Sequence, residues 1–325
     1  MKRCKEIIVL TILLVKSIYC GEYAGDFLTI GVGARALGMA GAFAGVADDA
    51  TTTYWNPGGM TEIKGVEVSS IKQIKTGELD ANYIFLNVVY NTGIEIGVFG
   101  ISYLRQSYGS IKIIDEKGEL ITDSAEIGEN AIYVSYAREI TEWISAGTSI
   151  KILKGTYPRD SKETGYIGGG IDTGIKMDLL KITDKLTGLY LGINLQDLWT
   201  IMNWEEINSK EIYREIVKPN LKIGIAYKKS ISLINIESQI IIAADIDTRY
   251  DGEYYTGAEV WIGEIGIRSG IKGFINQEKG INQDNIISYG ASIRWYFIGI
   301  DYSYVNNEIM PIQYLSIIGK FKKKG

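Results

Sequence analysis

Asn220-Leu-Lys-Ile-Gly-Ile-Ala-Tyr-Lys228 carries the pattern that decides the fold. Apolar side chains fall at every second position, and a lysine, a glycine or an alanine stands between them. Alternation with a period of two indicates a β-strand with one apolar and one polar face. The same alternation recurs in residues 166–179, where charges and glycines share the polar face, and in residues 188–196, where glycines share that face with Tyr190, Asn194 and Gln196. The chain is therefore predicted to consist mainly of two-faced strands.

The spacing of these segments predicts how the strands are connected. We predict about fourteen strands, at residues 66–75, 81–90, 93–105, 129–138, 142–155, 164–178, 187–196, 218–228, 231–248, 254–262, 264–276, 284–294, 297–305 and 312–321. Connections from even to odd strands are mostly tight, whereas those from odd to even strands are longer, notably 106–128 and 197–217. Short turns at one rim and longer loops at the other are typical of outer-membrane barrels. The predicted fold class is all-β, a transmembrane antiparallel β-barrel of about 14 strands.

Aromatic side chains lie near both ends of the predicted strands, as in the interfacial girdles of membrane barrels. Near the tight turns they are Tyr90, Trp143, Tyr227, Trp295 and Tyr296. Near the longer loops they are Tyr103, Tyr157, Trp199, Tyr254, Tyr255 and Tyr304. The alternative is a secreted, soluble β-sandwich that acts as a binding module, in which the apolar faces would pack on each other.

The composition excludes several classes of protein. None of the 325 residues is histidine, so His-dependent triads and His-ligated metal sites are excluded. We expect a protein that is not an enzyme and has no catalytic residues, metal or cofactor. The formal net charge of -5 supplies no basic excess for nucleic acid, so we expect no nucleic-acid partner.

The first twenty residues are predicted to be a secretory signal peptide. Lys2, Arg3 and Lys5 precede the apolar stretch 7–15, which is too short to remain as a membrane span. Cleavage after residue 20 would remove both cysteines, Cys4 and Cys20, and with them any disulfide. The chain is therefore expected to be exported, with its destination in the outer membrane.

Residues 21–65 lack the alternation of the later segments and are rich in glycine and alanine. Gly31-x-Gly33-x-x-Ala36 formally matches a dinucleotide-binding fingerprint, but no βαβ unit surrounds it. Small residues let backbone pack closely on backbone, so a compact insert of short helices and turns is predicted. Such an insert could sit inside the lumen.

Gly33-Ala-Arg-Ala-Leu-Gly-Met-Ala-Gly-Ala-Phe-Ala-Gly-Val-Ala-Asp-Asp-Ala50, followed by Tyr54-Trp-Asn-Pro-Gly-Gly-Met60, resembles the N-terminal signature of the PorV/PorQ family and, more distantly, of FadL-type outer-membrane transporters. Gly58 stands where such motifs usually carry alanine. The resemblance implies a plug, here called the hatch, at 21–65, a barrel at 66–321 and a tail at 322–325. The hatch motif residues are Gly33, Arg35, Gly38, Met39, Gly41, Asp48, Asp49, Trp55, Asn56 and Pro57.

Charged residues on the polar faces are expected to point into the lumen. The candidate lumen charges are Lys151, Asp172, Lys222, Arg268, Arg294 and Asp301. Asp48 and Asp49 are expected either to cap local turns or to pair with a lumen cation such as Lys151, Lys222, Arg268 or Arg294. A latch whose rupture opens a path is the alternative role for these two aspartates.

Two outer loops offer further candidates. An apolar patch at Leu198, Trp199, Met202 and Trp204 could collect a hydrophobic solute or dock a partner, or could fold back over the barrel mouth. Asp245, Asp247, Asp251 and Glu253 could hold calcium, although they lack the EF-hand spacing and solvated acidic loops are common.

The leading hypothesis is an outer-membrane β-barrel of the PorV/PorQ, FadL-like type that moves hydrophobic small molecules through a plugged lumen. The resemblance also implies an alternative, a component of a type IX-like system for protein secretion and surface attachment. The expected partners are outer-membrane lipid, together with a hydrophobic small-molecule cargo or with secretion-system and cargo proteins. A porin for polar solutes would need an open lumen, which a hatch opposes.

Overall fold

A computed structural model describes residues 24–74, 81–114, 118–159, 162–179, 188–205, 212–233, 235–275, 285–307 and 310–321. The predicted signal peptide at 1–20 and the predicted tail at 322–325 lie outside these residues. No helix in the described ranges is both long enough and apolar enough to cross a membrane.

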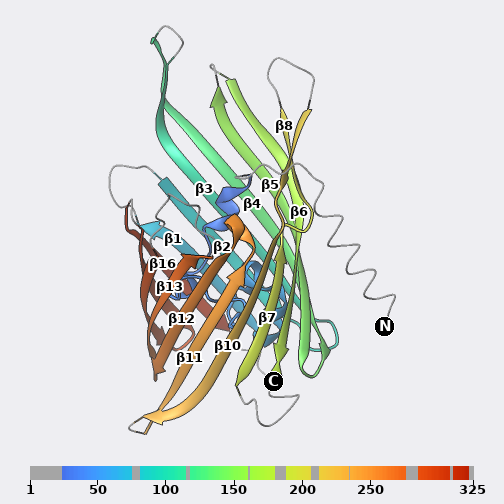
Figure 1. The fold of residues 1–325 in the computed structure, drawn as a ribbon, viewed down its shortest axis with the longest axis vertical. Coiled ribbons are helices and arrows are strands. Elements are labelled where there is room, and N and C mark those ends of the chain that lie inside the picture. The colour runs from blue at the N-terminus through green and yellow to red at the C-terminus, as the bar shows by residue number, and fades with distance from the viewer. Residues whose placement is uncertain are drawn as a thin grey trace.

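Fourteen strands of the described chain close into an antiparallel barrel (Figure 1). Strand β1 pairs with β16 and β5 pairs with β6, so the sheet has no open edge around the ring. The soluble sandwich is therefore wrong. The barrel strands are β1 (Val66–Ile74), β2 (Ala81–Asn91), β3 (Val98–Ile114), β4 (Leu120–Thr141), β5 (Ile144–Arg159), β6 (Lys162–Asp178), β7 (Leu189–Gln196), β10 (Asn220–Leu233), β11 (Ile236–Asp247), β12 (Glu253–Ile262), β13 (Ile265–Phe274), β14 (Ile286–Trp295), β15 (Ile298–Asn306) and β16 (Ile312–Phe321).

The predicted alternation sets the facing of each strand. In β10, Ile223, Ile225 and Tyr227 are exposed on the outside, whereas Lys222 is buried inside. Neighbouring strands repeat this arrangement, so that isoleucine, leucine and valine side chains form an outward apolar belt. Such a belt matches the hydrocarbon layer of a membrane.

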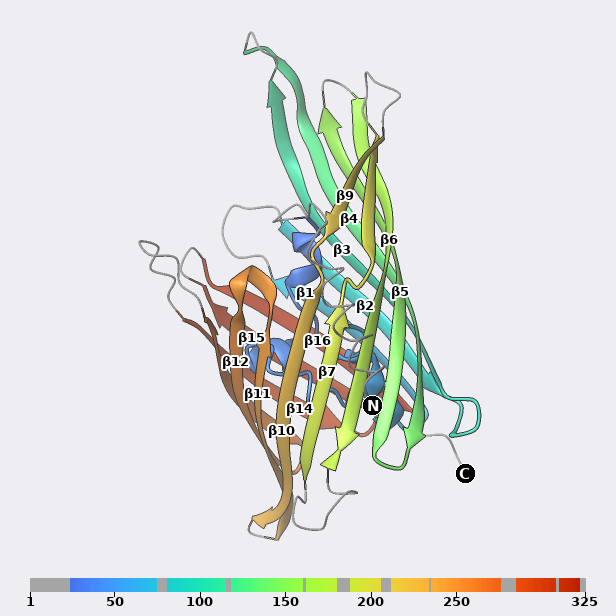
Figure 2. The ribbon, with the colours of Figure 1, turned by 45° about the vertical axis from the view of Figure 1, so that its right-hand side comes forward.

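One wall of the barrel rises above the rest, and the loop predictions there were wrong. Residues 106–128 were predicted as a long loop, but β3 and β4 continue through most of them as a tall hairpin. Within the predicted loop 197–217, β8 (Thr200–Glu205) and β9 (Ile212–Val217) form a second hairpin, and β8 pairs with β6. Figure 2 shows both hairpins rising above the opposite rim, with β5 and β6 between them.

The predicted aromatic girdle is only partly correct. Tyr90, Trp295 and Tyr296 are exposed near the tight turns, as expected. Tyr255 is instead buried in the lumen, where its hydroxyl donates to Asp247 at 2.8 Å. Tyr157 also turns inward, and its hydroxyl donates to Glu129 at 2.8 Å.

The N-terminal segment lies inside the ring of strands, where Figure 1 draws it in blue. Its short elements are η2 (Asp26–Thr29), α2 (Ala34–Gly38), α3 (Thr52–Trp55) and η3 (Pro57–Glu62), and a further turn, η6 (Arg249–Asp251), joins β11 to β12. Residues 31–47 are all buried, although the segment is too short to form a core alone. The barrel wall therefore supplies the surface on which this segment folds.

Candidate functional site

Turns rather than long helices shape the hatch. Helix α2 lies between Gly33 and Gly41, whose φ angles of 82° and 87° favour glycine. Asn56 begins η3: its side-chain oxygen accepts from the Gly58 N–H at 3.1 Å, and Pro57 takes the first helical position. The amide of Asn56 also donates to the Ala44 and Ile175 carbonyls, both at 3.0 Å, which ties this turn to β6.

Paired glycines on the inner wall receive the hatch backbone at three places. The cross-strand pairs are Gly257 with Gly270, Gly192 with Gly224, and Gly147 with Gly174. A Cβ on Gly270 would lie 2.3 Å from the Met39 carbonyl carbon, and a Cβ on Gly192 would lie 2.0 Å from the Ala44 oxygen. At the third pair, a Cβ on Gly147 would lie 2.5 Å from the Pro57 carbonyl. We call these pairs the glycine docks.

The same close packing accounts for other small residues of the motif. A Cβ on Gly38 would lie 2.9 Å from the Arg268 side chain. At Gly58, a Cβ would lie 2.9 Å from the Lys176 amide nitrogen. Trp55 supports the same segment, because its Nε1–H donates to the Val32 carbonyl at 2.8 Å.

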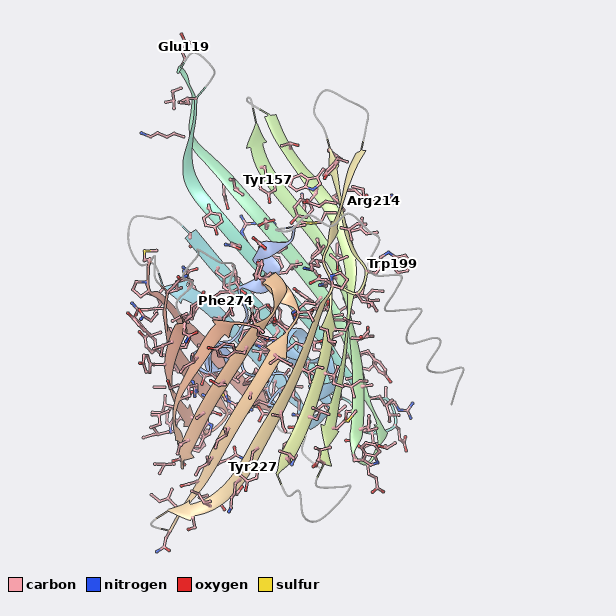
Figure 3. All side chains as sticks on the ribbon, in the orientation of Figure 1. Glu119, Tyr157, Trp199, Arg214, Tyr227 and Phe274 are labelled. Atoms are coloured by element: carbon pink, nitrogen blue, oxygen red, sulfur yellow. The ribbon has the colours of Figure 1, made fainter. Side chains whose placement is uncertain are left out.

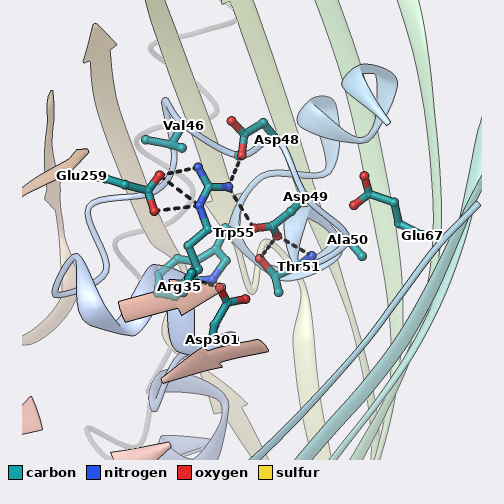
Figure 4. A network of polar contacts seen from close by, with 12 residues as sticks. Arg35, Val46, Asp48, Asp49, Ala50, Thr51, Trp55, Glu67, Glu259 and Asp301 are labelled. Atoms are coloured by element: carbon teal, nitrogen blue, oxygen red, sulfur yellow. Dashed lines mark hydrogen bonds and ion pairs between the residues drawn. The ribbon is translucent and has the colours of Figure 1, made fainter. Parts of the chain in front are cut away.

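Arg35 holds the hatch to the wall through a buried network of charges (Figure 4). Its guanidinium binds both oxygens of Glu259 on β12, with Nη2 2.6 Å from Oε2. Nη1 contacts Asp48 at 2.5 Å and Asp49 at 3.1 Å. A bidentate contact of this kind is strong and directional. Asp49 also caps the next turn by accepting from the Thr51 N–H at 3.0 Å.

Two wall lysines complete this network. Lys228 lies 2.8 Å from Asp48, and its ammonium also donates to the Val46 carbonyl at 2.9 Å. Lys176 lies 2.6 Å from Glu62 of η3 and donates to the carbonyls of Val46 and Ala47. We call the ion pairs of Arg35, Asp48, Asp49, Glu259 and Lys228 the latch.

Asp49 caps a local turn, which was one of the two expectations, and Asp48 pairs with a wall cation other than the four named from the sequence. Among the described residues, neither carboxylate pairs with Lys151, Lys222, Arg268 or Arg294. Arg35, from the hatch itself, lies nearer, and Lys228 comes from the inward face of β10 on which Lys222 also lies. Glu259 was missed as well, although it follows Gly257 on the inward face of its strand.

The six candidate lumen charges all form ion pairs along the inner wall. Lys151 lies 2.8 Å from Asp172 and also contacts Asp197. Arg294 lies 2.7 Å from Asp301. Arg268 lies 2.8 Å from Glu259, which joins the wall pairs to the latch. Lys222 lies 3.6 Å from Asp247 and 3.4 Å from the centre of the Tyr255 ring.

A cavity of about 250 Å³ lies between the hatch and the wall, on the side of the longer loops. Much of its lining is apolar or aromatic: Ile30, Leu37, Tyr54, Trp55, Ile286, Val305, Ile312 and Tyr314. On the tight-turn side of the hatch, a wider vestibule of about 650 Å³ is lined by latch residues together with Trp261, Arg294 and Lys320. The hatch separates these two spaces.

The candidate outer patch divides between two faces of the tall wall. Leu198 and Trp199 are exposed, and Figure 3 shows Trp199 on the outside of this wall. Met202 is buried, and Trp204 packs inward on Tyr166 with ring centres 4.8 Å apart. The patch predicted as a single outer surface is thus half folded back over the mouth.

The acidic loop is not a cluster on the surface. Asp245 is buried and accepts from the backbone N–H groups of Phe43 and Ala44 at 2.9 and 2.8 Å, so it binds the hatch. Asp247 is buried beside Lys222. Within the described ranges, no group of three or more His, Cys, Asp or Glu side chains could hold a metal ion.

A closed 14-strand barrel with an outward apolar belt is an outer-membrane barrel, and its fold is FadL-like. The chain is similar to the structure of the CymD monoaromatic hydrocarbon channel, with a TM-score of 0.59 and 13% identity over 90% of this chain and 98% of that one. It is also similar to the Pseudomonas putida toluene transporter TodX, with a TM-score of 0.57 and 11% identity over 90% of this chain and 99% of that one. At these identities the likeness concerns the fold. No protein-family model and no curated protein sequence matches the chain.

Proposed function

We propose that this chain moves small hydrophobic molecules across the outer membrane through its plugged lumen. The observation that carries the proposal is the cavity above the hatch, because most of its lining is apolar or aromatic. Ligand sites are typically concave and mostly apolar, with a few polar groups that orient the ligand. Two barrels of similar fold are described as a monoaromatic hydrocarbon channel and a toluene transporter, which supports a solute of this kind.

The geometry supports a route in two stages. A solute that enters between the longer loops would rest in the cavity, against Leu37 and Trp55 of the hatch. It would reach the vestibule only when α2 and the turn after it leave the wall, because these residues separate the two spaces. Opening would therefore require the latch and the glycine docks to separate.

Filling the cavity tests this proposal. Ser288 lines the cavity, and its Oγ has no hydrogen-bond partner within the described chain. Ser288→Phe should occupy the space and reduce uptake of radiolabelled toluene by cells that express the chain to the level of cells without it. The control, Leu86→Phe, changes an exposed residue of the outer belt and should transport normally. Unchanged uptake by correctly inserted Ser288→Phe would contradict the proposal.

A second candidate is a PorV/PorQ-type role in protein secretion and surface attachment. It is supported by the hatch sequence and by the tall wall, where the exposed Trp199 and Tyr213 offer a surface to a protein. Native mass spectrometry of the protein from outer membranes would separate the two functions. A bound small hydrophobic molecule supports transport, whereas a bound protein without such a ligand supports secretion.

A further inference from the structure

The cavity carries more positive than negative charge, although the chain as a whole is acidic. Lys222, Arg249 and Lys272 line it together with one carboxylate, that of Asp247. The formal net charge of the chain is -5. An aromatic hydrocarbon could meet these cations only through the face of its ring, whereas a negatively charged group could pair with them directly. The lining therefore indicates a ligand with a negatively charged group.

Two of these cations already have partners. Lys272 lies 2.7 Å from Glu253. Lys222 lies 3.6 Å from Asp247, and its ammonium rests 3.4 Å from the centre of the Tyr255 ring. Asp247 is further engaged, since it accepts from the Tyr255 hydroxyl at 2.8 Å and from the Arg249 backbone N–H at 3.2 Å. Within each of these two pairs the charges neutralise each other. Only the third cation of the lining has no direct ion pair among the described residues.

Arg249 is that third cation. Among the described residues, its guanidinium makes no ion pair or side-chain hydrogen bond, although the side chain is partly buried. It lies in η6, next to Tyr250, whose φ of 45° marks a tight left-handed turn. The carboxylates of Asp197 and Asp247 stabilise its charge without a direct ion pair, and a ligand carboxylate can bind the guanidinium directly through two parallel hydrogen bonds.

We propose that the cavity selects a small amphipathic anion, a single aromatic ring bearing a carboxylate. The carboxylate would bind Arg249, and the ring would lie against Leu37, Trp55 and Tyr314. A volume of about 250 Å³ is below the roughly 300–1,000 Å³ typical of drug-sized ligands, which favours one ring over a long chain. This inference rests on the proposed function, because it assumes that the cavity is where the solute binds.

The test compares two probes that differ in charge rather than in shape. 4-Ethylbenzoate and its neutral analogue 4-ethylbenzamide would be equilibrated by dialysis against the full chain in lipid nanodiscs at pH 7, with empty nanodiscs as the blank. We expect the carboxylate to bind at least about tenfold more tightly than the amide, since the charged hydrogen bonds are the stronger ones. Arg249→Gln should bring this ratio to about one, because it removes the charge.

Two variants serve as controls. Arg249→Lys keeps the charge and should retain most of the preference. Arg214→Gln removes an exposed cation of β9, in the tall hairpin away from the cavity (Figure 3), and should leave the ratio unchanged. Equal binding of both probes to the unmodified chain would overturn the anion selectivity and leave the proposed transport function standing. If neither probe binds, the anion selectivity also fails, whereas the transport function is decided separately by toluene uptake in the Ser288→Phe variant.

Discussion

Asp48 is the residue at which the hatch and two strands of the wall meet. Burial alone would raise the pKa of its carboxyl, but Arg35, Lys228 and Lys176 hold that pKa well below its usual value. Glu62 lies beside the same two lysines and shares their charge. An aspartate whose pKa is lowered by folding stabilises the folded state above its unfolded pKa of about 3.9, and this stabilisation is lost as the pH falls through the lower, folded value.

Acid should therefore loosen the hatch. We expect amide hydrogen exchange in the peptide 34–50, corrected for its intrinsic rate, to be slow and constant from pH 7 to about pH 5 and to rise well below about pH 4. Asp48→Asn, which cannot ionise, should exchange faster at pH 7 and show little further change. Mass spectrometry of peptic peptides measures both. A wild-type profile that is flat down to complete unfolding would reject the role of Asp48.

The direction of a single side chain was predictable from the sequence only in strands, where successive side chains alternate between the two faces. The six lumen charges lie on strands, where alternation alone sets their direction. The partners of Asp48 and Asp49 were missed because the hatch has no period, so the position of Arg35 beside them depends on the turn between Gly41 and Asp48. The sequence also could not predict that Arg249 has no direct ion pair within the described residues, since η6 follows no repeating pattern.

The glycine docks are the places where the shape of the inner wall matches the hatch backbone. Inward-facing side chains normally fill a barrel of this size or leave a channel. Here, Gly192 and Gly224 face each other across β7 and β10, and the backbone of Ala44 and Gly45 occupies the space that side chains would take. Contact between two backbones leaves no flexible group that could move aside.

A larger residue at a dock should displace the hatch. We expect Gly192→Val to make cells sensitive to an antibiotic too large for general porins, because valine would overlap the Ala44 carbonyl. Gly128→Val is the matched control, since a Cβ there would meet only the end of the flexible Arg105 side chain at 3.7 Å. Minimum inhibitory concentrations measure the effect. Equal resistance of both variants would show that the dock does not hold the hatch.

Strands were predictable as elements, whereas their ends were not. All fourteen barrel strands overlap the segments that alternation predicts, because one face must meet lipid and the other the lumen. Lys229 and Ser230 were predicted as a turn, but β10 continues through them to Leu233. Outside the membrane a strand does not need an apolar outer face. The upper part of the β3–β4 hairpin and the β8–β9 hairpin therefore lack the alternation that identified the barrel strands.

The whole molecule is organised by two surfaces of opposite character. The outer surface is a belt of exposed isoleucine, leucine and valine, including Ile225 at 44% exposure. The inner surface carries the ion pairs and glycines that bind the hatch. A soluble protein of this size would bury the first surface. The membrane therefore takes the place of the second layer that a sheet otherwise needs.

Arginine placed in the belt should be costly. Ile225→Arg is expected to lower the free energy of unfolding by roughly 2–4 kcal/mol, the range for Arg near the bilayer midplane. Ile94→Arg changes an exposed isoleucine in the turn between β2 and β3, and should cost only about 0–1 kcal/mol. Reversible denaturant unfolding from lipid vesicles gives both values. Similar costs would contradict the membrane belt.

The central claim is that the hatch closes the lumen of a barrel that is otherwise wide enough to conduct. Single-channel recording in planar bilayers tests it most directly, with the full chain compared with a chain that lacks residues 24–62. Insertion of both chains is checked first by the shift in gel mobility that folded barrels show on heating. We predict near-zero conductance for the full chain and steady open channels without the hatch. Near-zero conductance from a correctly inserted, hatch-free barrel would contradict the account.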